Sequence, residues 1–211
     1  MLDQGEFSYY KTIVDKDLGY PHGVINMNYF KASKVYAILA AFKRLSLPVT
    51  HRLHLTDQQF LELLTSVPKD KSKFPAIKYG NDHENDARQK YSEQHPNSEV
   101  VRVGITIKDK FWFFGASPDG LIRLKSSAPD SNFYGLLEIK CIYSCREELG
   151  RGGKIEGCKF LDKHGNLSRT HEYYYQIQTC AWATGAKFAH LFLWTETDSK
   201  LIPVPLDPDF A

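Results

Sequence analysis

Two carboxylates and a lysine stand where they could do chemistry together. Glu138 and Lys140 are two residues apart in the short apolar segment Tyr134–Cys141, so in a strand both side chains point to one face. Asp119 lies in the turn-forming Ser-Pro-Asp-Gly sequence of residues 117–120. Because an acid and a lysine in so apolar a strand are costly to bury, we expect them to be paired or bound to a metal.

A third carboxylate, Glu84, is predicted on a helix that starts near Asn81 or Asp82. Oxygen ligands with few or no histidines favour Mg²⁺ or Mn²⁺ over zinc. Such ions lower the pKa of an attacking water and neutralise charge on a transferring phosphoryl group. A nearby lysine can orient or deprotonate the water or stabilise the developing charge. The residues therefore predict metal-dependent hydrolysis of phosphodiesters.

The elements that must position these residues can be read from periodicity. Apolar residues recur at helical spacing over residues 32–45, and a capping-box pattern predicts a second helix from Thr56. A helix is also expected over Glu172–Thr184, ended by Gly185 in a left-handed conformation. Alternation and apolar runs predict strands at 100–107, 111–115, 121–124, Tyr134–Cys141 and Phe188–Trp194.

This order of elements predicts an α/β fold with a central mixed β-sheet flanked by helices. No internal repeat or low-complexity linker interrupts the chain, so we expect residues 1–211 to form a single domain. The longest apolar runs are too short to cross a bilayer, and no membrane association is expected. Without a secretory signal, and with only four cysteines, the chain fits a reduced intracellular compartment, cytoplasmic or nuclear.

The net charge of +2 does not by itself indicate nucleic acid, but the charge distribution is more informative. Between Asp17 and Asp57 there is no acidic residue, while five lysines and arginines, including Lys31, fall in that stretch. We interpret it as the better candidate for a phosphate-facing surface. A second basic region contains a glycine-rich loop with Arg151 and Lys154, which either closes over DNA or is an ordinary surface loop.

Five segments of the chain resemble the PD-(D/E)xK nucleases, and more closely the branch of phage lambda exonuclease and the YqaJ-type viral recombinases. Gly-Ala-Ser-Pro-Asp-Gly-Leu at 115–121 and Leu-Glu-Ile-Lys-Cys at 137–141 carry the nuclease motif. His-Glu-Asn-Asp-Ala-Arg at 83–88 matches the metal-binding helix, Tyr-Gln-Ile-Gln at 175–178 the glutamine motif, and Ala-Ser-Lys-Val at 32–35 the Ala-Ser motif. The resemblance implies a restriction-endonuclease-like core.

By this resemblance Glu84, Asp119, Glu138 and the backbone carbonyl of Ile139 would bind Mg²⁺, for which Mn²⁺ could substitute. Lys140 would act on the attacking water, and Gln176 would hold Lys140 or the substrate in place.

Ser33 and Ser117 match positions that contact the terminal 5′-phosphate of DNA in lambda-type members. The arginine that the family tends to carry before the Ala-Ser motif is replaced by Asn26, Met27 and Asn28. Lys31 could substitute for its charge, though not for its bidentate geometry.

The resemblance further implies a 5′-to-3′ exonuclease that acts on free ends of double-stranded DNA and yields single strands for recombination or repair. A single-strand annealing protein is the expected partner, and a toroidal homotrimer is a possible assembly.

Alternative interpretations stay open. Four cysteines, at positions 141, 145, 158 and 180, are the right number for an iron–sulfur nuclease, although buried free thiols account for them better. Cys145 and Cys158 could also bind zinc with His164 or His171.

The domain could instead be a DNA-binding or scaffolding module that has lost its chemistry, but all the acids and the lysine are present. The three tyrosines at 173–175 either stack on bases or pack in the core.

Overall fold

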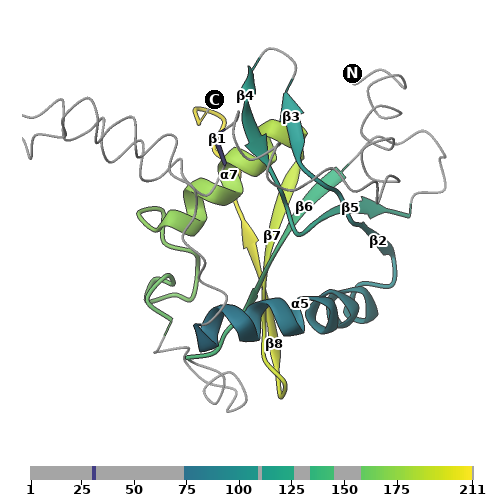
Figure 1. Cartoon of the computed structure of the whole chain (residues 1–211), viewed down its shortest axis with the longest axis vertical. Helices are drawn as coiled ribbons and strands as arrows, with labels where there is room; N and C mark the ends of the chain where they lie inside the picture. Colours follow the sequence, from purple (N-terminus) through teal and green to yellow (C-terminus); the bar gives the residue numbers. More distant parts are fainter. Residues whose placement is uncertain (1–29, 32–73, 109–110, 126–133, 145–157, 211) are drawn as a thin grey trace, which may run out of the picture.

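The computed structural model describes residues 30–31, 74–108, 111–125, 134–144 and 158–210. Five strands form a mixed sheet through the middle of this part (Figure 1). The two central strands are parallel and all other neighbours are antiparallel. In spatial order the strands are β2 (Ser98–Val101), β5 (Gly120–Leu124), β6 (Tyr134–Cys141), β7 (Phe188–Trp194) and β8 (Ser199–Val204).

A smaller sheet of three strands lies beside the first. Its order is β1 (Phe30–Lys31), β4 (Phe111–Ala116) and β3 (Thr106–Lys108), with β1 parallel to β4 and β3 antiparallel to it. The predicted α/β fold with a central mixed sheet is therefore confirmed.

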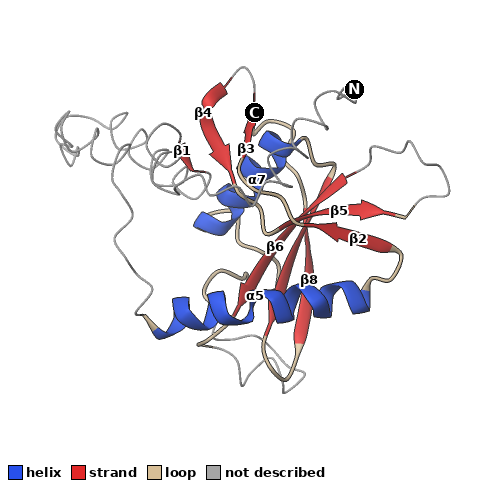
Figure 2. Cartoon of the chain, turned by 45° about the vertical axis from the view of Figure 1, so that its right-hand side comes forward, coloured by secondary structure: helices blue, strands red, loops and turns tan. Residues whose placement is uncertain are grey.

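Two helices cover opposite faces of the five-stranded sheet (Figure 2). Helix α5 (Pro75–Gln94) packs through Ala87 and Tyr91 against Leu137 and Ile139 of β6. Helix α7 (Glu172–Thr184) lies in the crossover between the parallel strands β6 and β7 and packs with Leu136 on the other face. Because residues alternate along β6, Glu138 and Lys140 share the α7 face with Leu136.

Several predicted elements agree with the structure residue for residue. Tyr134–Cys141 and Phe188–Trp194 are strands, and Glu172–Thr184 is a helix. Gly185 ends that helix with a φ of 71°, in the left-handed region that favours glycine. The third predicted helix exists but begins at Pro75 rather than near residue 81, because proline is well suited to the first helical turn.

The prediction of one strand over residues 100–107 is wrong. Strand β2 ends at Val101 and pairs with β5, whereas β3 begins at Thr106 and pairs with β4. The chain passes between sheets through residues 102–105, and a glycine there fits a bend better than a strand interior.

The partner segment, β4 to β5, leaves one sheet for the other at the same position along the strands. The two non-paired segments, residues 102–105 and 117–119, therefore lie opposite each other. Val101 pairs with Leu121 on one side of the bend, and Thr106 pairs with Ala116 on the other. Residues 117–119 therefore link β4 of the small sheet to β5 of the large one. Asp119 lies in this link, which we call the Asp119 corner (residues 117–119). The small sheet fixes the chain before it and the large sheet fixes the chain after it.

Some predicted features lie outside the described residues. They are the helix over 32–45, the helix from Thr56, the glycine-rich loop, and the side chains of Ser33, Cys145, Arg151 and Lys154. Among the helices that the structure describes, none has both the length and the apolar composition needed to cross a membrane.

Candidate active site

The corner that carries Asp119 is fixed to two other elements. The backbone N–H of Ile139 in β6 donates a hydrogen bond of 2.6 Å to Oδ2 of Asp119. The backbone carbonyl of Asp119 accepts from Nε and Nη2 of Arg88 on α5, at 3.3 and 3.1 Å. The half-buried Asp119 side chain is thereby placed directly beside the segment that carries Glu138 and Lys140.

Glu138 is the most deeply buried member of the site, with 1% of its surface exposed. Its Oε1 accepts hydrogen bonds from Nζ of Lys140 and from Nε2 of Gln176 on α7, each 2.6 Å long. Its Oε2 is buried, and no residue in the described part donates to it. Since an unpartnered buried carboxylate oxygen is costly, this atom is suited to receive a cation.

Lys140 lies between an acid and an aromatic ring. Its ammonium contacts Glu138 and stands 4.8 Å from the ring centroid of Tyr173. Burial alone would lower the pKa of Lys140, but the negative charges of Glu138 and Asp119 outweigh it and raise this pKa above its usual range. Lys140 is therefore held as a cation.

The pKa of Asp119 is raised as well, which for a carboxyl group favours the neutral form. Burial and the charge of Glu138 raise the pKa of Asp119 from 3.8 to about 7, and Glu84 adds a smaller effect in the same direction. Lys140 and the N–H of Ile139 oppose this rise. A carboxyl group whose pKa is raised this far, first by burial and then by neighbouring acids, is typical of a functional site.

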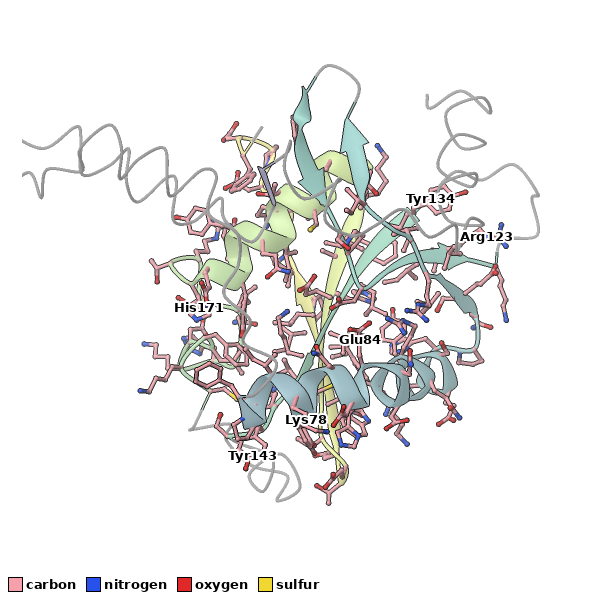
Figure 3. All side chains as sticks on the ribbon, viewed as in Figure 1. Lys78, Glu84, Arg123, Tyr134, Tyr143 and His171 are labelled. Carbon is pink, nitrogen blue, oxygen red and sulfur yellow. The ribbon has the colours of Figure 1, made fainter. Side chains whose placement is uncertain are left out.

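Glu84 approaches the same corner from α5 (Figure 3). Its Oε1 accepts a hydrogen bond from Nη2 of Arg88, the nitrogen that also contacts the Asp119 carbonyl. Among the described residues, no three His, Cys, Asp or Glu side chains are already arranged as a metal site. Glu84 thus lies close to Asp119 while its carboxylate is engaged by Arg88.

The structure brings together most of the predicted site residues. Glu138, Lys140 and Gln176 are hydrogen-bonded to one another, Asp119 is bonded to the backbone N–H of Ile139 between Glu138 and Lys140, and Glu84 is joined to Asp119 through Arg88.

The predicted phosphate-binding residues are less fully placed. Ser117 is exposed, two residues before Asp119. Lys31 lies in β1, where the structure describes the backbone alone, and Ser33, Arg151 and Lys154 lie outside the described residues.

The cysteines that the structure describes do not form a cluster. Cys141 and Cys180 are free thiols, Cys158 is buried, and no metal-binding group of three or more His, Cys, Asp or Glu occurs in the described segments. Cys180 is buried in α7, and burial raises the pKa of its thiol well above the usual value. These three residues behave as small core side chains.

Arg88 received no role from the sequence, and Tyr173 was expected only to stack on bases or to pack in the core. Arg88 is a nearly buried link between α5 and the Asp119 corner, and the spacing of four from Glu84 was the available signal. Of the three tyrosines of α7, Tyr174 is buried, whereas the ring of Tyr173 faces Lys140. Neither contact can be read from the sequence alone, because each joins segments far apart in the chain.

A mixed sheet between two helices, with an Asp at the start of one strand and Glu-Ile-Lys on the next, is the arrangement of the PD-(D/E)xK nuclease superfamily. The chain belongs to the family defined by the YqaJ-like viral recombinase domain, whose model matches residues 26–187.

Solved structures give the same fold. The alkaline exonuclease LHK-Exo from Laribacter hongkongensis is 21% identical, with a TM-score of 0.53 over 86% of this chain and 79% of the other. The same enzyme in complex with dAMP is 20% identical, with a TM-score of 0.53 over 88% of this chain and 81% of the other. The SOX protein in a complex with DNA is 11% identical, with a TM-score of 0.54 over 88% and 62%. A search of the curated proteins found no significant match.

Proposed function

We propose that the chain is a divalent-metal-dependent deoxyribonuclease that degrades double-stranded DNA from its ends in the 5′-to-3′ direction. The observation that carries the proposal is Glu138, buried at 1% exposure beside Asp119 and Lys140, with one carboxylate oxygen to which none of the described residues donates. A buried acid in this state is expensive for stability alone and is explained by a cation that binds there in the working enzyme.

The donor set fits Mg²⁺, with Mn²⁺ as a substitute. Asp119, Glu138 and the backbone carbonyl of Ile139 would hold the ion, and Glu84 would join them from α5; all of these are oxygen ligands. When bound, a divalent ion at such a site supplies an activated water and neutralises charge on the phosphoryl group.

The protein's own groups have distinct tasks in this proposal. Lys140, whose pKa is raised, donates from a charged ammonium to the water or to a phosphate oxygen, where negative charge develops. Gln176 holds Glu138 Oε1 through its amide and so leaves Oε2 directed to the cation. Of the roles expected for Lys140, orienting the water and stabilising charge fit better than deprotonation.

The substrate, end recognition and assembly are proposed from the family and the position of the site. Ser117 is exposed two residues from Asp119, as a contact to a terminal 5′-phosphate requires. Membership in a viral recombinase family supports a role in recombination or repair. We extend this to a single domain over residues 1–211, a homotrimer, and a single-strand annealing protein as partner.

Linear and covalently closed duplex DNA, each with Mg²⁺, Mn²⁺ or EDTA, test the activity. We expect linear DNA with a 5′-phosphate to be degraded with metal and closed circles to survive. Lys140→Ala and Asp119→Ala should abolish turnover while circular dichroism stays unchanged. Cleavage of closed circles would contradict an end-dependent enzyme. Equal rates of degradation with and without the 5′-phosphate would contradict the proposed role of Ser117. DNA binding without hydrolysis would favour a DNA-binding module that has lost its chemistry.

A further inference from the structure

Arg88 is a nearly buried cation whose guanidinium donates hydrogen bonds to two residues of the candidate active site, Glu84 and Asp119. Only 9% of its surface is exposed. Nη1 donates to Oδ1 of Asn85 at 2.8 Å, and Nη2 donates to Oε1 of Glu84. Nε and Nη2 both donate to the carbonyl oxygen of Asp119, which is 31 residues away in the chain.

This pattern uses the geometry of the guanidinium. Nε and Nη2 lie on one side of a rigid planar fork and converge on one acceptor, while Nη2 also reaches the carboxylate. A lysine ammonium would satisfy the charge of Glu84 but could not hold both acceptors with fixed spacing. Arg88 therefore sets where the Glu84 carboxylate lies relative to the Asp119 corner.

The attachment of α5 to the sheet does not depend on this link. Ala87 and Tyr91, fully buried or nearly so, pack with Leu137, Ile139 and Phe192 and hold the helix in place. The Glu84 side chain, by contrast, is 40% exposed and, without Arg88, is free to turn into solvent. Loss of the guanidinium should therefore affect the position of Glu84 more than the docking of α5.

We propose that Arg88 is a positioning residue that sets the metal affinity of the site by holding Glu84 against the Asp119 corner. This inference rests on the proposed metal-dependent function. Arg88 acts through Glu84, and the Asp119 carbonyl is the acceptor that holds the guanidinium in place. Groups that orient metal ligands in this way typically contribute about 10- to 100-fold to affinity.

The test is calorimetric titration of the metal-free full chain with Mn²⁺, in the absence of DNA. Arg88→Met should weaken Mn²⁺ binding by about 10-fold or more, and Arg88→Lys by a smaller factor, because charge is retained without the fork. Lys78→Met is the matched control, since it removes an exposed ion pair with Asp82 from the same helix. It should leave the affinity unchanged.

A double-mutant cycle separates positioning from general support of the fold. If Arg88 acts through Glu84, Arg88→Met should add little to the loss caused by Glu84→Gln. Additive losses would overturn the inference, as would wild-type affinity in a folded Arg88→Met protein. If Arg88→Met does not fold, Arg88→Lys in the same cycle decides. A wild-type chain that binds no Mn²⁺ would instead overturn the proposed function, and the inference with it.

Discussion

The side-chain amide of Gln176 donates to the carboxylate oxygen of Glu138 that the Lys140 ammonium also contacts, and both bonds are 2.6 Å long. One oxygen of this buried acid thus accepts from both donors, and the other accepts from none of the residues that the structure describes. The amide from α7 and the lysine from β6 together determine how the carboxylate is rotated.

Replacing Gln176 should therefore impair the site without removing any of its charged groups. We expect Gln176→Leu to reduce kcat by about 10- to 100-fold and to raise the metal concentration needed for half-maximal activity. Gln89→Leu, a change on the exposed face of α5, is the control and should behave as wild type. Unchanged metal dependence in Gln176→Leu would show that the amide does not position Glu138.

The buried pair of Glu138 and Lys140 makes a prediction about stability. In EDTA, Lys140→Met should lower the free energy of unfolding by about 3 kcal/mol, because it leaves a buried carboxylate without its cation. The double variant Glu138→Gln with Lys140→Met should recover most of this loss, since a neutral amide can still accept from Gln176. Urea denaturation measures both values, and a double variant no more stable than the single one would argue against a charge effect.

The raised pKa of Asp119 predicts a pH dependence in the metal-free protein. The ordinary pKa of Asp119 is 3.8, and its pKa in the folded chain is about 7. Between pH 3.8 and about 7, the folded chain keeps a proton on Asp119 that the unfolded chain has released. This group therefore lowers the free energy of unfolding as pH rises through that window. Asp119→Asn should remove the effect. Because a metal must displace the same proton, calorimetry should show Mn²⁺ affinity increasing from pH 5.5 to 7.5.

His190 should act in the opposite direction over much of the same range. Burial and the neighbouring charge of His95 lower the pKa of His190 from 6.5 to about 4, while its Nδ1 lies 2.7 Å from the Tyr91 hydroxyl. Below pH 6.5 the His190 side chain is protonated in the unfolded chain but stays neutral in the folded chain. This group therefore destabilises the fold as pH falls from about 6.5 to 4. His190→Asn should lose less stability than wild type across that interval in thermal melts. An identical slope would remove His190 from the acid response.

Elements with a strong local pattern were predictable from the sequence. The helix Glu172–Thr184 and the strands Tyr134–Cys141 and Phe188–Trp194 have apolar runs bounded by clear stops, and the structure has them at those bounds. The grouping of Asp119, Glu138 and Lys140 followed from their residue types and spacing, whereas Gln176 was assigned to the site by the family resemblance, and its amide donates to Glu138 rather than contacting Lys140.

Features that depend on distant pairing were not predictable. Residues 98–108 alternate like one strand, but their partners lie in two different sheets. Strand β8 was not predicted, and Pro203 within it argues against a strand; the sheet accepts it because β8 is an edge strand with one neighbour. The role of Arg88 depends on a carbonyl that the chain reaches only after three further strands, β2, β3 and β4.

The opposed breaks at residues 102–105 and 117–119 limit how the chain can change length. An extra residue in either segment would have to fit between two ladders whose registers are already fixed, and one in residues 117–119 would displace Asp119 directly. An insertion at 102–105 touches none of the site's side chains and would reach Asp119 only by moving β3 and β4. Loop-length variation among related sequences should consequently be excluded from this corner, whatever the identity of the residues that occupy it.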